Sequence, residues 1–288
     1  MRAAYPGVPT WVWLACRMDE LPRPPRDQLD VLVPADVRDG RTDRGEQAAR
    51  VWDGVVWGRL GRGELAWACF DQVDDPDLRP WTDAERGRVL RELGLHAQAE
   101  EHDLAGLRRA ADPVDEAMVW IGLTADAVGS AEVSETLLRL AAARDALDSA
   151  PDGARRDRQV LRLTWVETEV AGLVGDDPPD GPWPARDGDT MTWPDVFDAG
   201  TVFHRAKAAL FAGALTRDLW MLDRAAELAP PVLAWAVHLA RADLGVPGAE
   251  HAARDAWRAV TPPSHVAEAA ASTPTARRLA GDLAAGTG

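Results

Sequence analysis

The first candidate for a metal-binding or catalytic site in this chain is a run of aspartates in a proline-rich segment. Residues 176–180 read Asp-Asp-Pro-Pro-Asp, a spacing of carboxylates that can hold Mg²⁺ against a diphosphate when it lies along a helix. Pro178 and Pro179 forbid that geometry in a helix interior. The nearby Asp187-Gly188-Asp189 is too short for a calcium loop and lacks the later bidentate Glu. We interpret the segment as an acidic loop, with a magnesium-dependent all-α enzyme using residues 176–189 as an alternative.

A second candidate group combines two histidines with two glutamates. It consists of His96, Glu100, Glu101 and His102. A zinc-binding pair on one helix face needs histidines four residues apart, whereas His96 and His102 are six apart. The other histidines are scattered, and no G-x-S-x-G signature accompanies them. We interpret these side chains as solvated helix residues, and the sequence predicts no catalytic residue, no metal site and no cofactor.

Tryptophans form the third group, and the chain has 13 of them. Most fall in expected helices at positions that face a neighbour, which favours packing between helices. Trp81, Trp183 and Trp193 lie at helix starts or in the proline-rich loop, so they are better candidates for contact with a partner. The packing set consists of Trp52, Trp57, Trp67, Trp120, Trp165, Trp220, Trp235 and Trp257.

These residues must be positioned by a unit that the chain repeats about three times between residues 48 and 143. Small and apolar residues recur with an offset of 33 between the first two copies and 35 between the next two. Each copy indicates two helices joined by a short turn, an arrangement that cannot bury its apolar face alone and stacks on its neighbours. The matching positions are Gly54, Trp57, Gly61 and Ala66, then Gly87, Leu90, Gly94 and Ala99, then Gly122, Ala125, Gly129 and Ser134.

The glycines of the repeat have two expected roles. Gly54, Gly87 and Gly122 fall in the middle of a helix, where glycine costs about 1 kcal/mol relative to Ala and is tolerated where two backbones approach closely. Gly61, Gly94 and Gly129 are expected to end the first helix of each copy in a left-handed conformation. Expected helix starts are the capping box of Thr82 and Glu85, Ser130, and the cap–proline pairs Asp112-Pro113 and Thr273-Pro274.

At these residues the chain resembles the tetratricopeptide-repeat family, whose pattern is Trp-x2-Leu-Gly-x2-Tyr, then Ala-x3-Phe, then Pro. The first copy offers Gly54-x2-Trp57 and Ala66-x3-Phe70, and the third offers Ile121-Gly122-x2-Ala125. It departs from the pattern where Arg50 and Asp53 replace apolar residues and where Asp103 replaces the aromatic. The resemblance implies a right-handed superhelix of helical hairpins with a concave binding face, and it implies no chemistry.

The whole sequence therefore predicts an all-α protein, an α-α superhelix of stacked, tetratricopeptide-like hairpins with a capping C-terminal helix. We expect an N-terminal capping segment and connector over 1–46, helical repeats over 47–175, a Pro/Gly/Asp-rich loop over 176–193, and further hairpins over 194–288. Expected helices cover 47–60, 63–73, 83–93, 96–110, 114–128, 131–148, 156–174, 195–212, 216–229, 231–244, 248–260 and 274–284.

The composition and net charge of the chain limit the classes of partner that it is expected to bind. The net charge of −15 opposes broad contact with nucleic acid, whose phosphates would be repelled. One Lys stands against 31 Arg, which we interpret as codon usage. Cys16 and Cys69 are the chain's two cysteines and lack CxxC spacing, so a reducing, cytoplasmic location is expected. No apolar stretch reaches the length of a membrane span, so no membrane partner is expected.

The expected binding site lies on the first helices of successive hairpins, where equivalent residues form ladders along a concave face. Arg59, Arg88 and Arg91 would converge there and bind a carboxylate of the partner, with Trp81 stacking beside them. The alternative is that these arginines pair with Asp53, Glu85 and Glu92 on their own surface. The predicted partner-binding set is Arg59, Trp81, Arg88, Arg91, Glu116, Leu123 and Asp126.

The function expected from this site is that of a non-enzymatic scaffold that binds a peptide or protein in a concave groove. The first alternative is a ligand- or peptide-sensing regulatory module of a transcriptional control system, and the second is the magnesium-dependent enzyme described above. The sequence does not indicate an oligomeric state.

Overall fold

The fold is built almost wholly from helices, as expected. A computed structural model of the chain describes residues 24, 45–261, 265, 269–271 and 273–281. The segment expected as an N-terminal cap and connector, 1–46, lies outside the described residues except at positions 24, 45 and 46. None of the described helices combines the length and apolarity that crossing a membrane requires.

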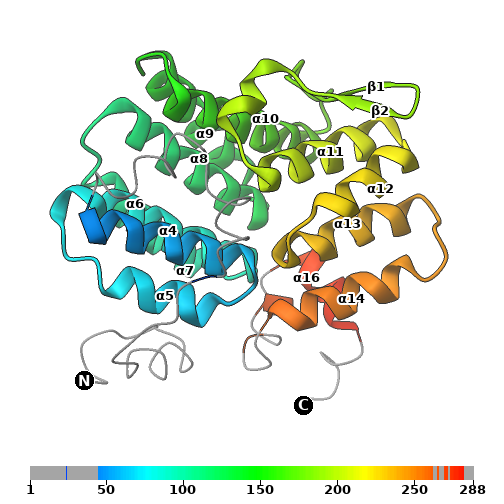
Figure 1. Ribbon diagram of the computed structural model, residues 1–288, viewed down its shortest axis with the longest axis horizontal. Coiled ribbons are helices and arrows are strands. Elements are labelled where there is room, and N and C mark those ends of the chain that lie inside the picture. Colours follow the sequence, from blue (N-terminus) through cyan, green and yellow to red (C-terminus); the bar gives the residue numbers. More distant parts are fainter. Residues whose placement is uncertain (1–23, 25–44, 262–264, 266–268, 272, 282–288) are drawn as a thin grey trace.

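Ten of the helices form five antiparallel hairpins, each closed by a short turn (Figure 1). A single long helix, α10 (Ala154–Val174), stands between the third and fourth hairpins and packs on α8 and α9. A short helix, α16 (Pro274–Ala280), packs on α14. The hairpins are α4 (Gly45–Arg59) with α5 (Gly63–Asp71), α6 (Arg79–Glu92) with α7 (His96–Leu107), α8 (Pro113–Gly129) with α9 (Val133–Asp148), α11 (Val202–Thr216) with α12 (Leu219–Leu228), and α13 (Pro231–Asp243) with α14 (Ala249–Val260).

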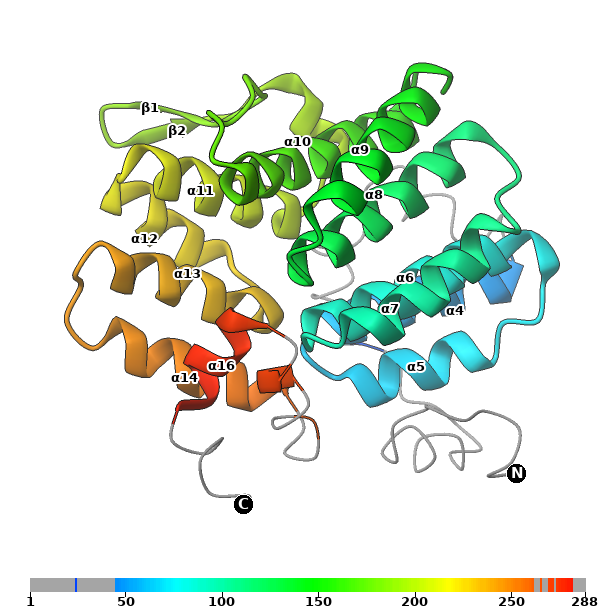
Figure 2. The same cartoon turned by 180° about the vertical axis from the view of Figure 1, so that it is seen from behind.

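The array of hairpins closes on itself, which the sequence did not predict. Figures 1 and 2 show the hairpins following one another around a ring, and α13 contacts α4. The turn at Gly61 lies so close to the end of α14 that a Cβ there would be 2.4 Å from Val260 Cγ1. The first and last hairpins therefore contact each other, whereas the ends of an open array have no such neighbour. The right-handed superhelix implied by the family resemblance stays a prediction.

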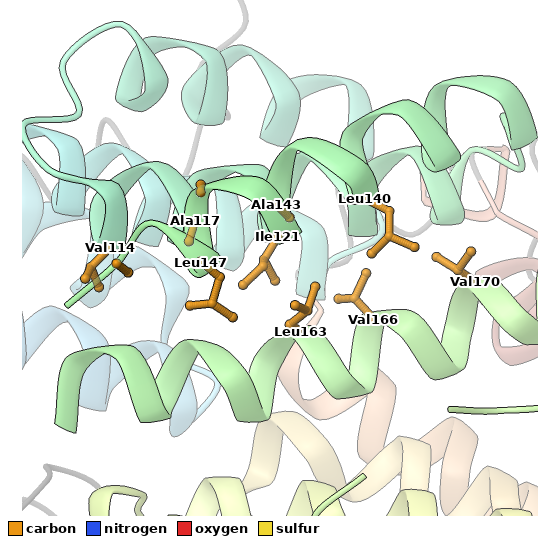
Figure 3. Packing of buried hydrophobic residues seen from close by; sticks show 11 residues of the cluster. Val114, Ala117, Ile121, Leu140, Ala143, Leu147, Leu163, Val166 and Val170 are labelled. Atoms are coloured by element: carbon orange, nitrogen blue, oxygen red, sulfur yellow. The ribbon is translucent and has the colours of Figure 1, made fainter. Parts of the chain in front are cut away.

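The apolar core is divided among the contacts between neighbouring helices. The largest cluster lies between α8, α9 and α10, where aliphatic side chains from the three helices interdigitate (Figure 3). Alternation of small and branched residues lets α8 and α9 pack closely, and α10 then covers their shared face. The labelled side chains are Val114, Ala117, Ile121, Leu140, Ala143, Leu147, Leu163, Val166 and Val170.

The mid-helix glycines pack as expected. A Cβ on Gly54 would lie 2.4 Å from the ring of Phe70 on α5, and a Cβ on Gly87 would lie 2.5 Å from the carboxylate of Asp103 on α7. Phe70 and Asp103 stand at the same offset of 33 as the two glycines, so the first two hairpins share one packing scheme. A Cβ on Gly122 of α8 would also lie 2.4 Å from the carboxylate of Asp103, so the second hairpin packs closely on the third at this position.

Several expected helix ends are correct and three are wrong. Asp112 and Thr273 cap α8 and α16, and Gly61 and Gly94 are left-handed, with φ of +74° and +83°. The capping box at Thr82 is wrong because α6 already begins at Arg79 with Pro80 in its first turn. Ser130 ends α8 and does not cap α9. Gly129 is helical because the ring of His96 packs on it, and Ala131 takes the left-handed position instead, with φ of +58°.

The acidic loop over 176–193 is partly ordered. Residues 176–184 have no regular structure, but β1 (Ala185–Asp187) pairs with β2 (Thr190–Thr192) in an antiparallel hairpin around Gly188, whose φ is +59°. The single helix expected over 195–212 is wrong. A 3-10 helix, η2 (Asp195–Ala199), comes first, and the extended Gly200 separates it from α11.

Candidate functional site

The helices that face the middle of the ring enclose a pocket with a volume of about 570 Å³. Its walls come from α4, α6, α8, α10, the start of α11, and the 3-10 helix η1 (Pro76–Leu78). No lining residue comes from the second helices α5, α7, α9, α12 and α14 within the described part of the chain. The volume is that of a small-molecule site.

The pocket is rich in positive charge, although the chain carries a net charge of −15. Seven basic side chains line it, against five acidic ones. The basic residues are Arg59, Arg88, Arg91, Arg155, Arg158, Arg162 and Lys207, and the acidic residues are Asp75, Asp77, Glu85, Glu92 and Asp115.

Arg88 belongs to the pocket wall and is neutralised within its own helix. Its guanidinium bonds Glu85 at 2.6 Å and Glu92 at 2.7 Å, one turn before and after it on α6. These carboxylates outweigh the cost of burial and raise the pKa of Arg88. For Arg88 the alternative stated above, pairing on its own surface, is therefore what the structure shows.

Arg91 is neutralised by carboxylates of two other helices. It bonds Asp126 of α8 at 2.8 Å and also bonds Asp103 of α7. Both carboxylates are about 1% exposed. Burial raises the pKa of Asp103, and the neighbouring Asp126 carboxylate acts in the same direction. Arg91 thus joins three helices electrostatically and has no charge left over for a ligand.

Arg162 of α10 is different because none of the described residues forms an ion pair with it. Its Nη1 donates to the amide oxygen of Gln159 at 2.8 Å. Among the described residues, no carboxylate oxygen lies within 4.0 Å of its guanidinium. Burial lowers the pKa of Arg162 to about 10; the carboxylates of Glu85 and Asp103 oppose this shift, and the guanidiniums of Arg91 and Arg88 add to it. A partly buried cation that forms no ion pair with the described residues is costly, so this position is suited to an anion supplied from outside.

Lys207 of α11 also forms no ion pair with the described residues. Its Nζ lies over two aromatic rings, 5.1 Å from the centroid of Trp165 and 5.7 Å from that of Phe211. Within the described chain no carboxylate lies within 4.0 Å of this ammonium group. Burial lowers the pKa of Lys207, and Arg162 and Arg91 repel the charged form, although Glu169 opposes the shift.

The start of α11 adds a neutral histidine to this end of the pocket, and the end of α4 adds Arg59. His204 Nδ1 accepts a hydrogen bond from the backbone N–H of Thr201 at 3.0 Å. Burial lowers the pKa of His204 well below its usual value, and the cations Arg59 and Arg162 contribute. Arg59 donates to Thr201 Oγ1 at 3.2 Å and stacks 4.7 Å from the ring of Phe203. The ring closure described above brings Arg59 and Phe203, 144 residues apart, together.

Aromatic side chains complete the walls. Trp52 of α4 and Trp81 of α6 meet edge to face with centroids 4.8 Å apart. Trp165 lies tilted against His204 at 5.7 Å, beside Lys207. The pocket therefore combines cations with flat apolar surfaces, which is the combination that binds an organic anion.

The structure brings only part of the predicted binding set to this pocket. Arg59, Trp81, Arg88 and Arg91 line it. Three members do not: Glu116 is exposed, Leu123 is buried in the core, and Asp126 lies behind Arg91 as its ion-pair partner. The expected ladders were wrong on α8 because they used the offset of 35. The residues of α8 that face the pocket are Val114, Asp115, Met118, Ile121, Gly122 and Ala125.

Arg162 and Lys207 were missed at the sequence level. Both lie outside the repeat, on α10 and α11, so the ladders could not include them. One signal was available for Lys207, since it is the chain's single lysine among 32 basic residues. No comparable signal marks Arg162, which is one of 31 arginines.

The other candidate groups have structural roles. His96 contacts Asp126 at 3.2 Å, His102 packs edge-on against Trp67 at 5.1 Å, and Glu100 pairs with Arg139. Of the tryptophans proposed for partner contact, Trp183 and Trp193 pack against Phe211 and Phe197 respectively. Among the described residues, no three His, Cys, Asp or Glu side chains are grouped so that they could hold a metal ion.

Replacing Arg162 with Met is expected to raise the free energy of unfolding by about 1 kcal/mol, because it removes a partly buried charge that has no ion-pair partner among the described residues and keeps an apolar side chain of similar length. The control is Arg155→Met in the same pocket, which loses bonds to Asp112 and Asp115 and should be neutral or destabilising by up to about 1 kcal/mol. Urea unfolding measures both. A loss of stability in Arg162→Met would contradict the assignment of its charge as uncompensated.

Comparisons with known proteins found no protein similar to this chain. No family model, no curated protein and no solved structure matches this chain.

Proposed function

We propose that this chain is a binding protein whose central pocket holds the anionic group of a small organic ligand. The observation that supports the proposal is a pair of partly buried cations, Arg162 and Lys207, that line the pocket without an ion-pair partner among the described residues. Each costs folding free energy in the empty protein, and a bound carboxylate or phosphate would offset that cost. Charge-assisted hydrogen bonds of this kind are the strong ones.

The walls suggest what the rest of the ligand is like. Trp52, Trp81 and Trp165 offer flat apolar surfaces on three different helices, so a planar or aromatic body fits beside the anionic group. A pocket volume of about 570 Å³ accommodates a small molecule or the end of a short acidic peptide, but it is too small for a folded protein. The proposal therefore favours the ligand-sensing alternative over the open-groove scaffold expected from the sequence, and it assigns no catalytic step.

Calorimetric titration with benzoate and its neutral analogue benzamide tests the proposal. Benzoate is expected to bind to the wild-type protein and benzamide at least about tenfold more weakly, since the amide cannot form a charge-assisted contact. Arg162→Gln and Lys207→Gln should each weaken benzoate binding by about tenfold. Arg144→Gln, which removes a half-exposed arginine paired with Glu167 on the outside of the ring, is the control and should leave binding unchanged. Equal binding of benzoate by all four proteins would place the anion site elsewhere.

A further inference from the structure

The identity of the basic residue at position 207 carries information beyond its charge. The chain uses Arg at 31 of its 32 Lys or Arg positions, so a site that needs only a positive charge is served by Arg elsewhere in this protein. Lysine differs from arginine in one chemical respect that matters here. Its amine can lose a proton near neutral pH when it is buried, and the free amine is a nucleophile, whereas a guanidinium stays protonated.

The surroundings of Lys207 are those of a reactive amine. The side chain lines the pocket, so a ligand can reach it. Its Nζ lies near the rings of Trp165 and Phe211, and no carboxylate of the described chain lies within 4.0 Å of it. Burial lowers its pKa; the carboxylates of Glu169 and Glu92 oppose this shift, and the positive charges of Arg162 and Arg91 add to it. The net shift is downward, so the free-amine fraction is larger than for an exposed lysine.

We propose that Lys207 forms a Schiff base with the aldehyde or ketone group of an anionic ligand. This inference rests on the proposed function in that Arg162 would anchor the anionic group while Lys207 reacts. In the reaction the Nζ lone pair attacks the carbonyl carbon, and the amine protons move to the carbonyl oxygen. That oxygen leaves as water, and a carbon–nitrogen double bond remains. No oxidant or reductant is needed, and hydrolysis reverses the step.

The ligand class follows from the two groups together. It is a carbonyl compound that also carries a carboxylate or a phosphate, because the same pocket holds the amine and the cation. The aromatic walls favour a planar body between the two functions. A neutral aldehyde would meet the amine without the anchor and should react more slowly.

Reductive trapping tests the inference on the full chain. The probe is 4-formylbenzoate with cyanoborohydride, compared with the neutral 4-formylbenzamide, and peptide mapping by mass spectrometry locates the adducts. The chain's α-amino group is the other primary amine and serves as an internal reference. At Lys207 we expect the anionic probe to be trapped about tenfold faster than the neutral one, the effect of one charge-assisted contact. At the α-amino group the two rates should be similar.

Two variants and one ligand separate the possible outcomes. Arg162→Gln should remove the preference for the anionic probe while Lys207 still reacts, and Lys207→Arg should abolish the internal adduct. If wild-type Lys207 is not trapped, or is trapped without preference for the anion, the Schiff-base inference is overturned. Binding of 4-(hydroxymethyl)benzoate, which has no carbonyl to react, then decides about the proposed function. If it binds in an Arg162-dependent way the anion site stands, and if it does not bind both proposals fail.

Discussion

Replacing Arg91 with Met is expected to lower the free energy of unfolding by about 3–5 kcal/mol, because it leaves two buried carboxylates without their cation. Asp103 and Asp126 are each about 1% exposed, and both bond this one guanidinium. Gly122 gives Asp103 no room to move, since a Cβ there would already touch its carboxylate. Chemical denaturation followed by circular dichroism measures the loss.

The matched control for this experiment is Arg144→Met. Arg144 bonds Glu167 at 2.7 Å but is about half exposed, so its loss should cost about 1 kcal/mol or less. Similar losses in the two variants would mean that burial of the Asp103–Arg91–Asp126 cluster has no special energetic role.

The defect of Arg91→Met should also depend on pH. Burial already raises the pKa of Asp103 in the folded protein, and removal of Arg91 raises it further. A carboxyl group whose pKa is raised by folding binds its proton more tightly in the native state, so the native state gains stability as the pH falls. The difference in stability between wild type and Arg91→Met should therefore shrink between pH 8 and pH 5. A difference that grows on acidification would contradict this assignment.

A second large effect is expected at Gly54, where α4 packs tightly against the ring of Phe70 on α5. In Gly54→Ala the new Cβ would lie 2.4 Å from Phe70 Cε1, and this ring is fully buried. Helices α4 and α5 must then move apart, so stability should fall by about 1–3 kcal/mol even though Ala is the better helix former.

Gly172 provides the opposite case within the same protein. It lies inside α10, is exposed, and has no atom within 4 Å of a Cβ built on it. Gly172→Ala should therefore raise stability by about 0.5–1 kcal/mol through helix propensity alone. If both alanine variants were stabilised, the close packing of α4 on α5 would be wrong.

The helices and their pairing were largely predictable because they depend on local signals. The offset of 33 between Gly54 and Gly87 reflects a real packing scheme, since Phe70 and Asp103 occupy the same place beneath them. The expected ends at Gly61 and Gly94 are correct because a left-handed glycine closes a helix whatever lies around it. At Gly129 the local signal was overridden by a tertiary contact, the ring of His96.

The pocket was only partly predictable because it depends on how the ring closes. The repeat positions place Arg88 and Arg91 near it. The pairing of Arg88 with Glu92 on its own helix could be anticipated from the sequence, but the pairing of Arg91 with Asp126 depends on the three-dimensional arrangement. Arg162 and Lys207 come from helices outside the repeat, and nothing in the sequence indicates that α10 and α11 face α4 and α6. The site is defined by which cations lack an ion-pair partner, and the sequence alone shows only that the cations are present.

The central claim is that Arg162 and Lys207 form an anion site inside the ring, and a crystal structure of the protein with 4-bromobenzoate tests it most directly. Anomalous scattering locates the bromine without ambiguity. The account predicts bromine in the central pocket between the tryptophans, with the carboxylate within hydrogen-bond distance of Arg162 and Lys207. Bromine bound only on the outer surface, with acidic side chains of the chain itself occupying the two cations, would contradict it.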